Sequence, residues 1–139
     1  MNPLVFAYLR IVNALRPRMR VDLPIRAEYL THDSAVAKAY LEDPLVVKKP
    51  AVRLIYELVK ASREVWRYID RVDKPIMLLH GGRDLIVPPE ASAKAYERIR
   101  GRAKELKVYP ELYHEILNET QWKNVLNDII QRLSRVLGT

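Results

Sequence analysis

The chain has 139 residues, 49% of them apolar and 29% charged, which is typical of one folded domain with a sizeable core and excludes a disordered chain. The absence of cysteine excludes disulfides and thiolate metal sites, and the three histidines lack the spacing of a metal site. The net charge of +7 comes from 24 Lys and Arg residues spread along the chain, so we interpret it as a basic surface and expect no nucleic-acid partner. We expect no metal and no other cofactor.

The N-terminal half is predicted to be helical and interrupted by prolines. Apolar residues recur at helical spacing over 4–15, which predicts an amphipathic helix that ends before Pro17. Arg10 interrupts this apolar stretch and argues against a signal peptide, so we expect a cytoplasmic protein. The apolar face of the helix could meet a core, a lipid surface or a partner helix. Residues 18–30 are predicted to form a linker.

Two more helices are predicted before residue 71. Asp33 or Ser34 can cap a short helix that runs to Glu42, and His32 before it is predicted to lie on the surface. Residues 51–70 carry an apolar stripe with charge on the opposite side, which predicts a longer amphipathic helix. Three large aromatic residues are predicted to be core residues and not a substrate platform: Tyr56, Trp66 and Trp122.

The C-terminal half alternates strand and helix. Strands are predicted at 76–80 and 104–110, and helices at 89–99 and 120–137. This order implies a parallel sheet with a right-handed crossover, in which ligands and catalytic groups gather at the carboxyl ends of the strands. One strand is followed by Asp84 and the other by His114. We therefore expect these two side chains to lie within hydrogen-bonding distance.

An Asp–His pair at this place is suited to acid–base chemistry. A carboxylate held to Nδ1–H of His114 would fix the imidazole tautomer and stabilise its charged form, leaving Nε2 to take a proton from a nucleophile. The alternative is that Asp84 only accepts hydrogen bonds from amides of its own turn. His80 is predicted to be structural. Glu115 and Glu119 are predicted to accept hydrogen bonds from backbone donors of the His114 loop.

The chain resembles the C-terminal half of α/β-hydrolase serine esterases, closest to their lysophospholipase and monoacylglycerol-lipase branch, which is grouped with serine aminopeptidase-like hydrolases. The matching stretches are DPLV at 43–46, KPIMLLHGGRDLIVPPEAS at 74–92 and LKVYPELYHEILNE at 106–119. The resemblance implies the α/β class, with residues 71–139 as the C-terminal portion of the hydrolase core, including its last two parallel strands. It implies that residues 1–70 form a helical cap or lid.

The resemblance also implies the functional roles. Asp84 would be the triad acid and His114 the triad base, and the substrate would be a lysophospholipid or monoacylglycerol-like ester. A cap over the acyl pocket could contact a membrane surface.

The chain departs from the family at the nucleophile. No Gly-x-Ser-x-Gly elbow is present. No serine has a glycine two residues before it and another two residues after it, and the chain has four glycines: Gly81, Gly82, Gly101 and Gly138. The oxyanion-hole donors also lie upstream in this family. We therefore expect the C-terminal part of a carboxylic-ester hydrolase that lacks the nucleophile, as a truncation, a gene fragment or half of a split enzyme. The alternative is a non-catalytic remnant that acts as an interaction or scaffold protein.

Without an upstream half, parts of the sheet and its helices would be left uncovered. The inner edge of the strand at 76–80 would present unpaired N–H and C=O groups, and helices meant to cover further strands would expose apolar stripes. We expect the chain to self-associate or to bind an upstream hydrolase half.

Overall fold

The protein is described by a computed structural model that covers residues 3–138. Its internal contacts form two compact units, which we describe separately. Within the described residues, the first unit comprises residues 3–24 together with Pro44–Ile69, and the second comprises Ile25–Asp43 together with residues 70–138. This division differs from the predicted boundary at residue 70, since Ile25–Asp43 groups with the C-terminal part of the chain, where Leu30, Thr31 and His32 bond to residues 115–119.

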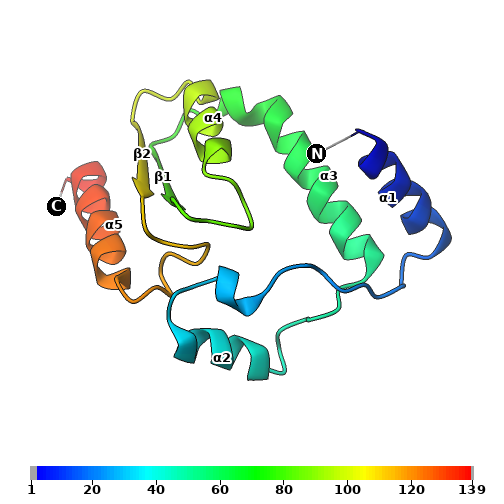
Figure 1. Cartoon of the computed structure of the whole chain (residues 1–139). Helices are drawn as coiled ribbons and strands as arrows, with labels where there is room; N and C mark the ends of the chain where they lie inside the picture. The colour runs from blue at the N-terminus through cyan, green and yellow to red at the C-terminus, as the bar shows by residue number, and fades with distance from the viewer. Residues whose placement is uncertain (1–2, 139) are drawn as a thin grey trace. The chain divides into compact units, whose positions relative to one another are not determined.

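Two predicted helices form the first unit. Helix α1 (Pro3–Leu15) packs against helix α3 (Val52–Tyr68), which confirms both predictions (Figure 1). The ring of Phe6 stacks on Tyr56 with 5.8 Å between centroids, and the Arg63 guanidinium lies 4.4 Å from the Phe6 centroid. An antiparallel bridge between Arg20 and Ala51 joins the segments that follow α1 and precede α3.

The outer face of α1 is apolar and exposed. Four residues spaced three or four apart share it: Leu4, Tyr8, Ile11 and Leu15. The exposed fraction is 76% for both Leu4 and Leu15, so most of this stripe is not used in the core of the first unit. None of the helices in the described part of the chain combines the length and the apolarity needed to cross a membrane.

The second unit is built on a two-stranded parallel sheet. Strand β1 (Ile76–Gly81) pairs with strand β2 (Lys104–Tyr109), with Gly81 opposite Tyr109 at their carboxyl ends. Helix α4 (Glu90–Arg98) makes the crossover and helix α5 (Trp122–Leu137) follows β2, as the alternating pattern predicts (Figure 1).

Side chains on the two faces of β2 contact different helices. The ammonium of Lys104 donates to the carbonyls of Tyr96 and Ile99, in and just after α4, at 2.6 Å. Lys107 and Tyr109 instead donate to the carboxylate of Asp128 in α5, at 2.6 and 2.7 Å. Because side chains alternate between the two faces of a strand, α4 and α5 cover opposite faces of β2.

The segment Ile25–Asp43 forms two short helical elements. A 3₁₀ turn, η1 (Ala27–Tyr29), precedes helix α2 (Ser34–Glu42), and Asp33 caps α2 by accepting hydrogen bonds from the amides of residues 35 and 36. The prediction of a plain linker over 18–30 is wrong at its end, because Ala27 and Leu30 are only 4% and 5% exposed. A second 3₁₀ turn, η2 (Ile69–Arg71), ends α3.

Among the described residues of the second unit, one edge of the sheet has no paired strand and one helix face is exposed. Within residues 3–138, β2 is the sole strand that pairs with β1, so the other edge of β1 has no strand beside it. Helix α5 exposes an apolar stripe at every third or fourth position: Leu126, Ile130, Leu133 and Leu137. The predicted exposed stripes are thus present. Trp122 is also 41% exposed, so its prediction as a core residue is wrong.

Candidate active site

The turn after β1 approaches the loop after β2 very closely. The Gly82 amide donates to the Tyr109 carbonyl at 2.7 Å, and the Arg83 amide donates to the Leu112 carbonyl at 3.0 Å. A Cβ atom at Gly81 would lie 2.5 Å from the Leu112 carbonyl oxygen, which is far inside van der Waals contact. Glycine is therefore required where these two backbones meet, and the same approach brings the residues that follow each strand together.

Asp84 stands in this turn with its carboxylate almost fully enclosed, at 2% side-chain exposure. Oδ1 accepts hydrogen bonds from the amides of Ile86 and Val87 at 2.8 and 2.9 Å, and Oδ2 lies 2.8 Å from Nδ1 of His114. The predicted contact between Asp84 and His114 is therefore present. The turn amides are bonded as well, so one oxygen of the carboxylate meets the turn and the other meets His114.

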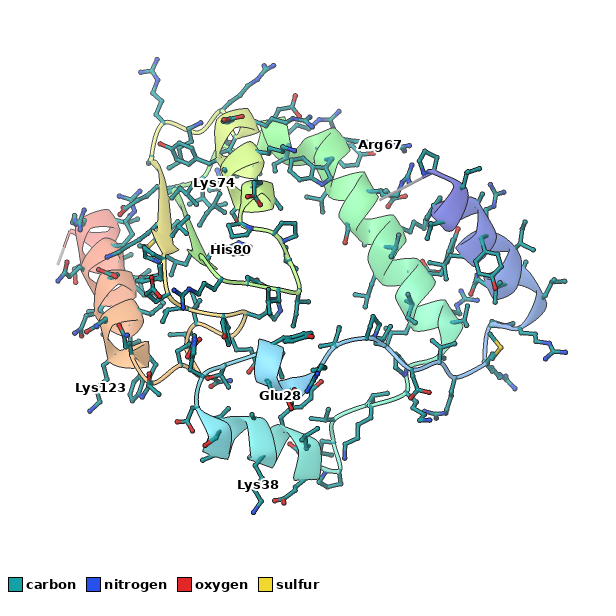
Figure 2. The ribbon with its side chains drawn as sticks, viewed as in Figure 1. Glu28, Lys38, Arg67, Lys74, His80 and Lys123 are labelled. Atoms are coloured by element: carbon teal, nitrogen blue, oxygen red, sulfur yellow. The ribbon has the colours of Figure 1, made fainter. Side chains whose placement is uncertain are left out.

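A second imidazole holds the same carboxylate. Nε2 of His80 lies 3.1 Å from Oδ2 of Asp84 and 3.0 Å from the Val87 carbonyl oxygen, while Nδ1 lies 2.6 Å from the Ser92 hydroxyl. Nε2 faces only acceptors and must carry a proton, which leaves Nδ1 to accept the hydroxyl proton of Ser92. Figure 2 shows His80 between β1 and the start of α4. These contacts agree with the structural role predicted for His80.

These contacts determine the charge state of Asp84. Burial acts to raise the pKa of the carboxyl group, but the hydrogen bonds from His114, Val87 and Ile86 outweigh it, and the pKa is lowered from its ordinary value. Asp84 is therefore ionised at neutral pH. An ionised carboxylate at Nδ1 keeps the Nδ1–H tautomer of His114 and leaves Nε2 as the proton acceptor.

The backbone on both sides of His114 is fixed by hydrogen bonds. The Tyr113 amide donates to Oε1 of Glu119 at 2.7 Å, and the Glu115 amide donates to the Leu30 carbonyl at 2.8 Å. The His114 side chain itself is 35% exposed, so a reacting group can reach its ring.

Glu119 is the most enclosed charged group of the second unit, with 0% side-chain exposure. Its carboxylate accepts hydrogen bonds from the amides of Tyr113 and His32 and pairs with Nδ1 of His32 at 2.9 Å. The His32 ring stacks on Tyr113 with 3.7 Å between centroids. Burial acts to raise the pKa of Glu119, but its hydrogen bonds with Tyr113 and His32 lower it overall.

The predicted backbone-acceptor role of Glu119 is thus confirmed, whereas its pairing with His32 was missed. His32 is exposed, as predicted, but its ring nitrogen and its amide are both engaged with Glu119. The two residues are 87 positions apart, and neither lies in a pattern that would connect them.

Within residues 3–138, no serine hydroxyl is hydrogen-bonded to the Asp84–His114 pair. The hydrogen bonds of His114 lead to Asp84 and to no serine, and the Ser92 hydroxyl is taken by His80. No group of three or more histidine and carboxylate side chains in this range is arranged to hold a metal ion. The arrangement can orient the His114 imidazole and leaves its Nε2 available to take up or give a proton.

Both carboxylates make the stability of the second unit sensitive to acid. The pKa values of Asp84 and Glu119 are lower in the folded chain than the values of about 3.9 and 4.3 expected for the unfolded chain. The unfolded state therefore binds more protons as the pH falls below about 5, and the stabilisation is lost progressively as the pH passes through the folded-state values. We expect the midpoint of urea unfolding to be constant from pH 6 to 7 and to decrease below pH 5. A midpoint that is the same at pH 4 and pH 7 would contradict this expectation.

Comparison with known proteins gives consistent matches along most of the chain. The family described as serine aminopeptidase, S33, matches residues 1–121. A monoacylglycerol lipase of Mycolicibacterium smegmatis is 30% identical over 130 residues, which cover 92% of this chain and 46% of that protein.

Two solved structures are similar in fold. The monoacylglycerol lipase of Paleococcus ferrophilus superposes with a TM-score of 0.83 at 23% identity, over 94% of this chain and 51% of that chain. A soluble variant of the Saccharomyces cerevisiae monoglyceride lipase, in complex with a substrate analog, gives a TM-score of 0.82 at 28% identity, over 96% of this chain and 50% of that chain. The chain thus spans about half the length of the relatives that it matches.

Proposed function

Since the chain belongs to the serine aminopeptidase (S33) family, we propose that it is the C-terminal part of a carboxylic-ester hydrolase acting on monoacylglycerol-like lipids. The fold class expected from the sequence, an α/β-hydrolase portion with two parallel strands and flanking helices, is confirmed by the two similar lipase structures. The catalytic proposal rests on one observation. His114 Nδ1 lies 2.8 Å from a buried Asp84 carboxylate at the carboxyl ends of adjacent parallel strands.

In the proposed mechanism, Nε2 of His114 takes the proton of a serine hydroxyl that a segment outside this sequence supplies. The serine oxygen attacks the ester carbonyl, and Asp84 stabilises the imidazolium that forms. His114 then gives the proton to the departing glycerol oxygen as the ester bond breaks, which leaves an acyl-enzyme. Nε2 then deprotonates a water whose oxygen attacks the acyl carbonyl; the bond to the serine oxygen breaks, that oxygen takes the proton back from Nε2, and the fatty acid leaves. Asp84 keeps its negative charge throughout.

The upstream segment has two places to bind on the second unit. The unpaired edge of β1 offers backbone N–H and C=O groups to a further strand, and the exposed stripe of α5 offers apolar surface to the same sheet extension. We propose that these surfaces receive the nucleophile-bearing half of the hydrolase. Self-association through the same edge is the competing outcome.

The first unit is proposed to serve as the cap. Its α1 helix exposes an apolar stripe, and the first 21 residues contain arginines but no Asp or Glu. Exposed apolar side chains next to positive charge suit the surface of a membrane that contains anionic lipids. Contact of α1 with the lipid that carries the substrate is therefore part of the proposal.

Reconstitution tests the function directly. The chain is co-purified with the N-terminal half of the Mycolicibacterium smegmatis lipase, and hydrolysis of a monoacylglycerol and of a lysophospholipid is measured. We expect hydrolysis only with both halves present, with the monoacylglycerol preferred, and a loss of at least about 10³-fold in kcat with His114→Ala.

The exposed Glu111, which pairs with Arg83 at 2.6 Å, provides the control Glu111→Gln, expected to retain activity. A stable complex that hydrolyses neither lipid would favour the non-catalytic scaffold instead. Ester hydrolysis by the chain alone that is lost with Ser92→Ala would also contradict the proposal.

A further inference from the structure

The loop that carries His114 has no regular secondary structure of its own. It lies between the end of β2 at Tyr109 and the start of α5 at Trp122. Such a segment holds a side chain at a defined place only if its backbone groups are bonded to something rigid. The backbone on one side of His114 is bonded to the Glu119 carboxylate, and on the other side to the Leu30 carbonyl.

The Glu119 carboxylate joins the loop to a distant segment. Oε1 accepts from the Tyr113 amide at 2.7 Å and from Nδ1 of His32 at 2.9 Å. Oε2 accepts from the His32 amide at 3.0 Å and faces the Thr31 hydroxyl at 3.4 Å. All these groups lie in the second unit, and the donors come from segments about 80 residues apart along the sequence.

A fully buried carboxylate is unfavourable unless its oxygens are well bonded, and an apolar residue would fill the same space with no such requirement. The benefit of Glu119 is therefore geometric. Its two oxygens accept hydrogen bonds in defined directions from two segments. These bonds fix the position of the Tyr113 amide relative to residues 31 and 32. The next residue in the chain is His114.

We propose that Glu119 is a positioning residue for His114, acting through the Tyr113 amide and anchored by the segment 30–32. This proposal rests on the proposed function, because it assigns Glu119 a role in the acid–base chemistry of that same site. It implies that the Asp84–His114 hydrogen bond depends on a segment from the N-terminal half of the sequence. Glu119 does not touch the reacting atoms.

The substitution Glu119→Gln separates charge and geometry from size. A glutamine side chain keeps the volume but replaces one acceptor oxygen with an NH₂ group. Both oxygens of Glu119 face donor groups. The NH₂ group of the glutamine would therefore point at another donor in either orientation of the amide. Either the Tyr113 amide or the His32 groups must lose their partner.

The readout is the Nδ1 proton of His114, observed by NMR in the chain labelled with ¹⁵N-histidine. In the unmodified chain we expect a protected Nδ1–H resonance and the Nδ1–H tautomer. In Glu119→Gln we expect exchange of that proton with water to become at least tenfold faster, with the thermal transition of the chain retained. Glu115→Gln, whose carboxylate accepts a hydrogen bond from the Asn118 side chain, is the control expected to leave the exchange unchanged.

Unchanged exchange of the His114 Nδ1 proton in a folded Glu119→Gln chain would overturn the proposal. If that variant does not fold, the proposal is tested on the unmodified chain. Exchange of the Tyr113 amide and of the His114 Nδ1 proton is followed at rising temperatures below the melting transition, and the proposal requires the two to accelerate together. Independent acceleration would refute it. None of these measurements needs a nucleophile, so a failure to reconstitute ester hydrolysis is a separate result.

Discussion

Replacing Asp84 with Asn is expected to lower kcat of the reconstituted hydrolase by about 10⁴-fold, with a much smaller change in KM. The carboxylate accepts a hydrogen bond from Nδ1–H of His114, with 2.8 Å between Oδ2 and Nδ1. An asparagine can turn its NH₂ group toward Nδ1, which moves the ring proton to Nε2 and removes the base from the nucleophile. The imidazolium formed during the reaction would also lose its counter-charge.

The effect on the tautomer can be measured without any activity. In the chain alone, the ¹⁵N shifts of His114 should report a protonated Nδ1 before the substitution and a larger fraction of protonated Nε2 after it. Glu111→Gln, which removes an exposed carboxylate from the neighbouring loop, should change neither the shifts nor kcat. Retention of kcat within tenfold in Asp84→Asn would mean that another group serves as the triad acid.

Replacing Gly81 with Ala is expected to destabilise the second unit by about 3 kcal/mol or more, a value at the upper end for overpacked sites. The added methyl group would overlap the carbonyl oxygens of Leu112 and Tyr113. These are backbone atoms, so the overlap cannot be relieved by a rotamer change. The whole His114 loop must move, and the Asp84–His114 hydrogen bond should lengthen with it.

Urea unfolding checks this expectation, and Gly101→Ala is the matched control. A Cβ atom at Gly101 would lie 3.3 Å from the Val72 carbonyl oxygen, so only a small adjustment is required there. We expect the midpoint for Gly101→Ala to lie close to that of the unmodified chain. Equal effects of the two substitutions would show that loss of backbone freedom, and not the close approach at Gly81, determines the result.

Most of the helices and strands, and the proximity of Asp84 and His114, could be predicted from local patterns in the sequence. Apolar spacing of three or four residues predicted α1, α3 and α5, and continuous or alternating apolar runs predicted β1 and β2. Such patterns are local, so they can be read without knowing the path of the chain. The Asp84–His114 contact followed from one further rule, that neighbouring parallel strands end at the same edge of their sheet.

The contacts that hold the Asp84–His114 pair in place could be identified only in the folded chain. The segment 25–43 lies far from the C-terminal strands in the sequence, yet it bonds to the loop after β2 and supplies His32 to the buried Glu119. Equally, nothing local indicated that His80 and Ser92 would support Asp84. A buried polar group takes its partners from whatever donors the folded chain brings near it, and periodicity carries no information about donors many residues away. The proximity of Asp84 and His114 could therefore be predicted from the sequence, while the hydrogen bonds that orient the two side chains required the folded chain.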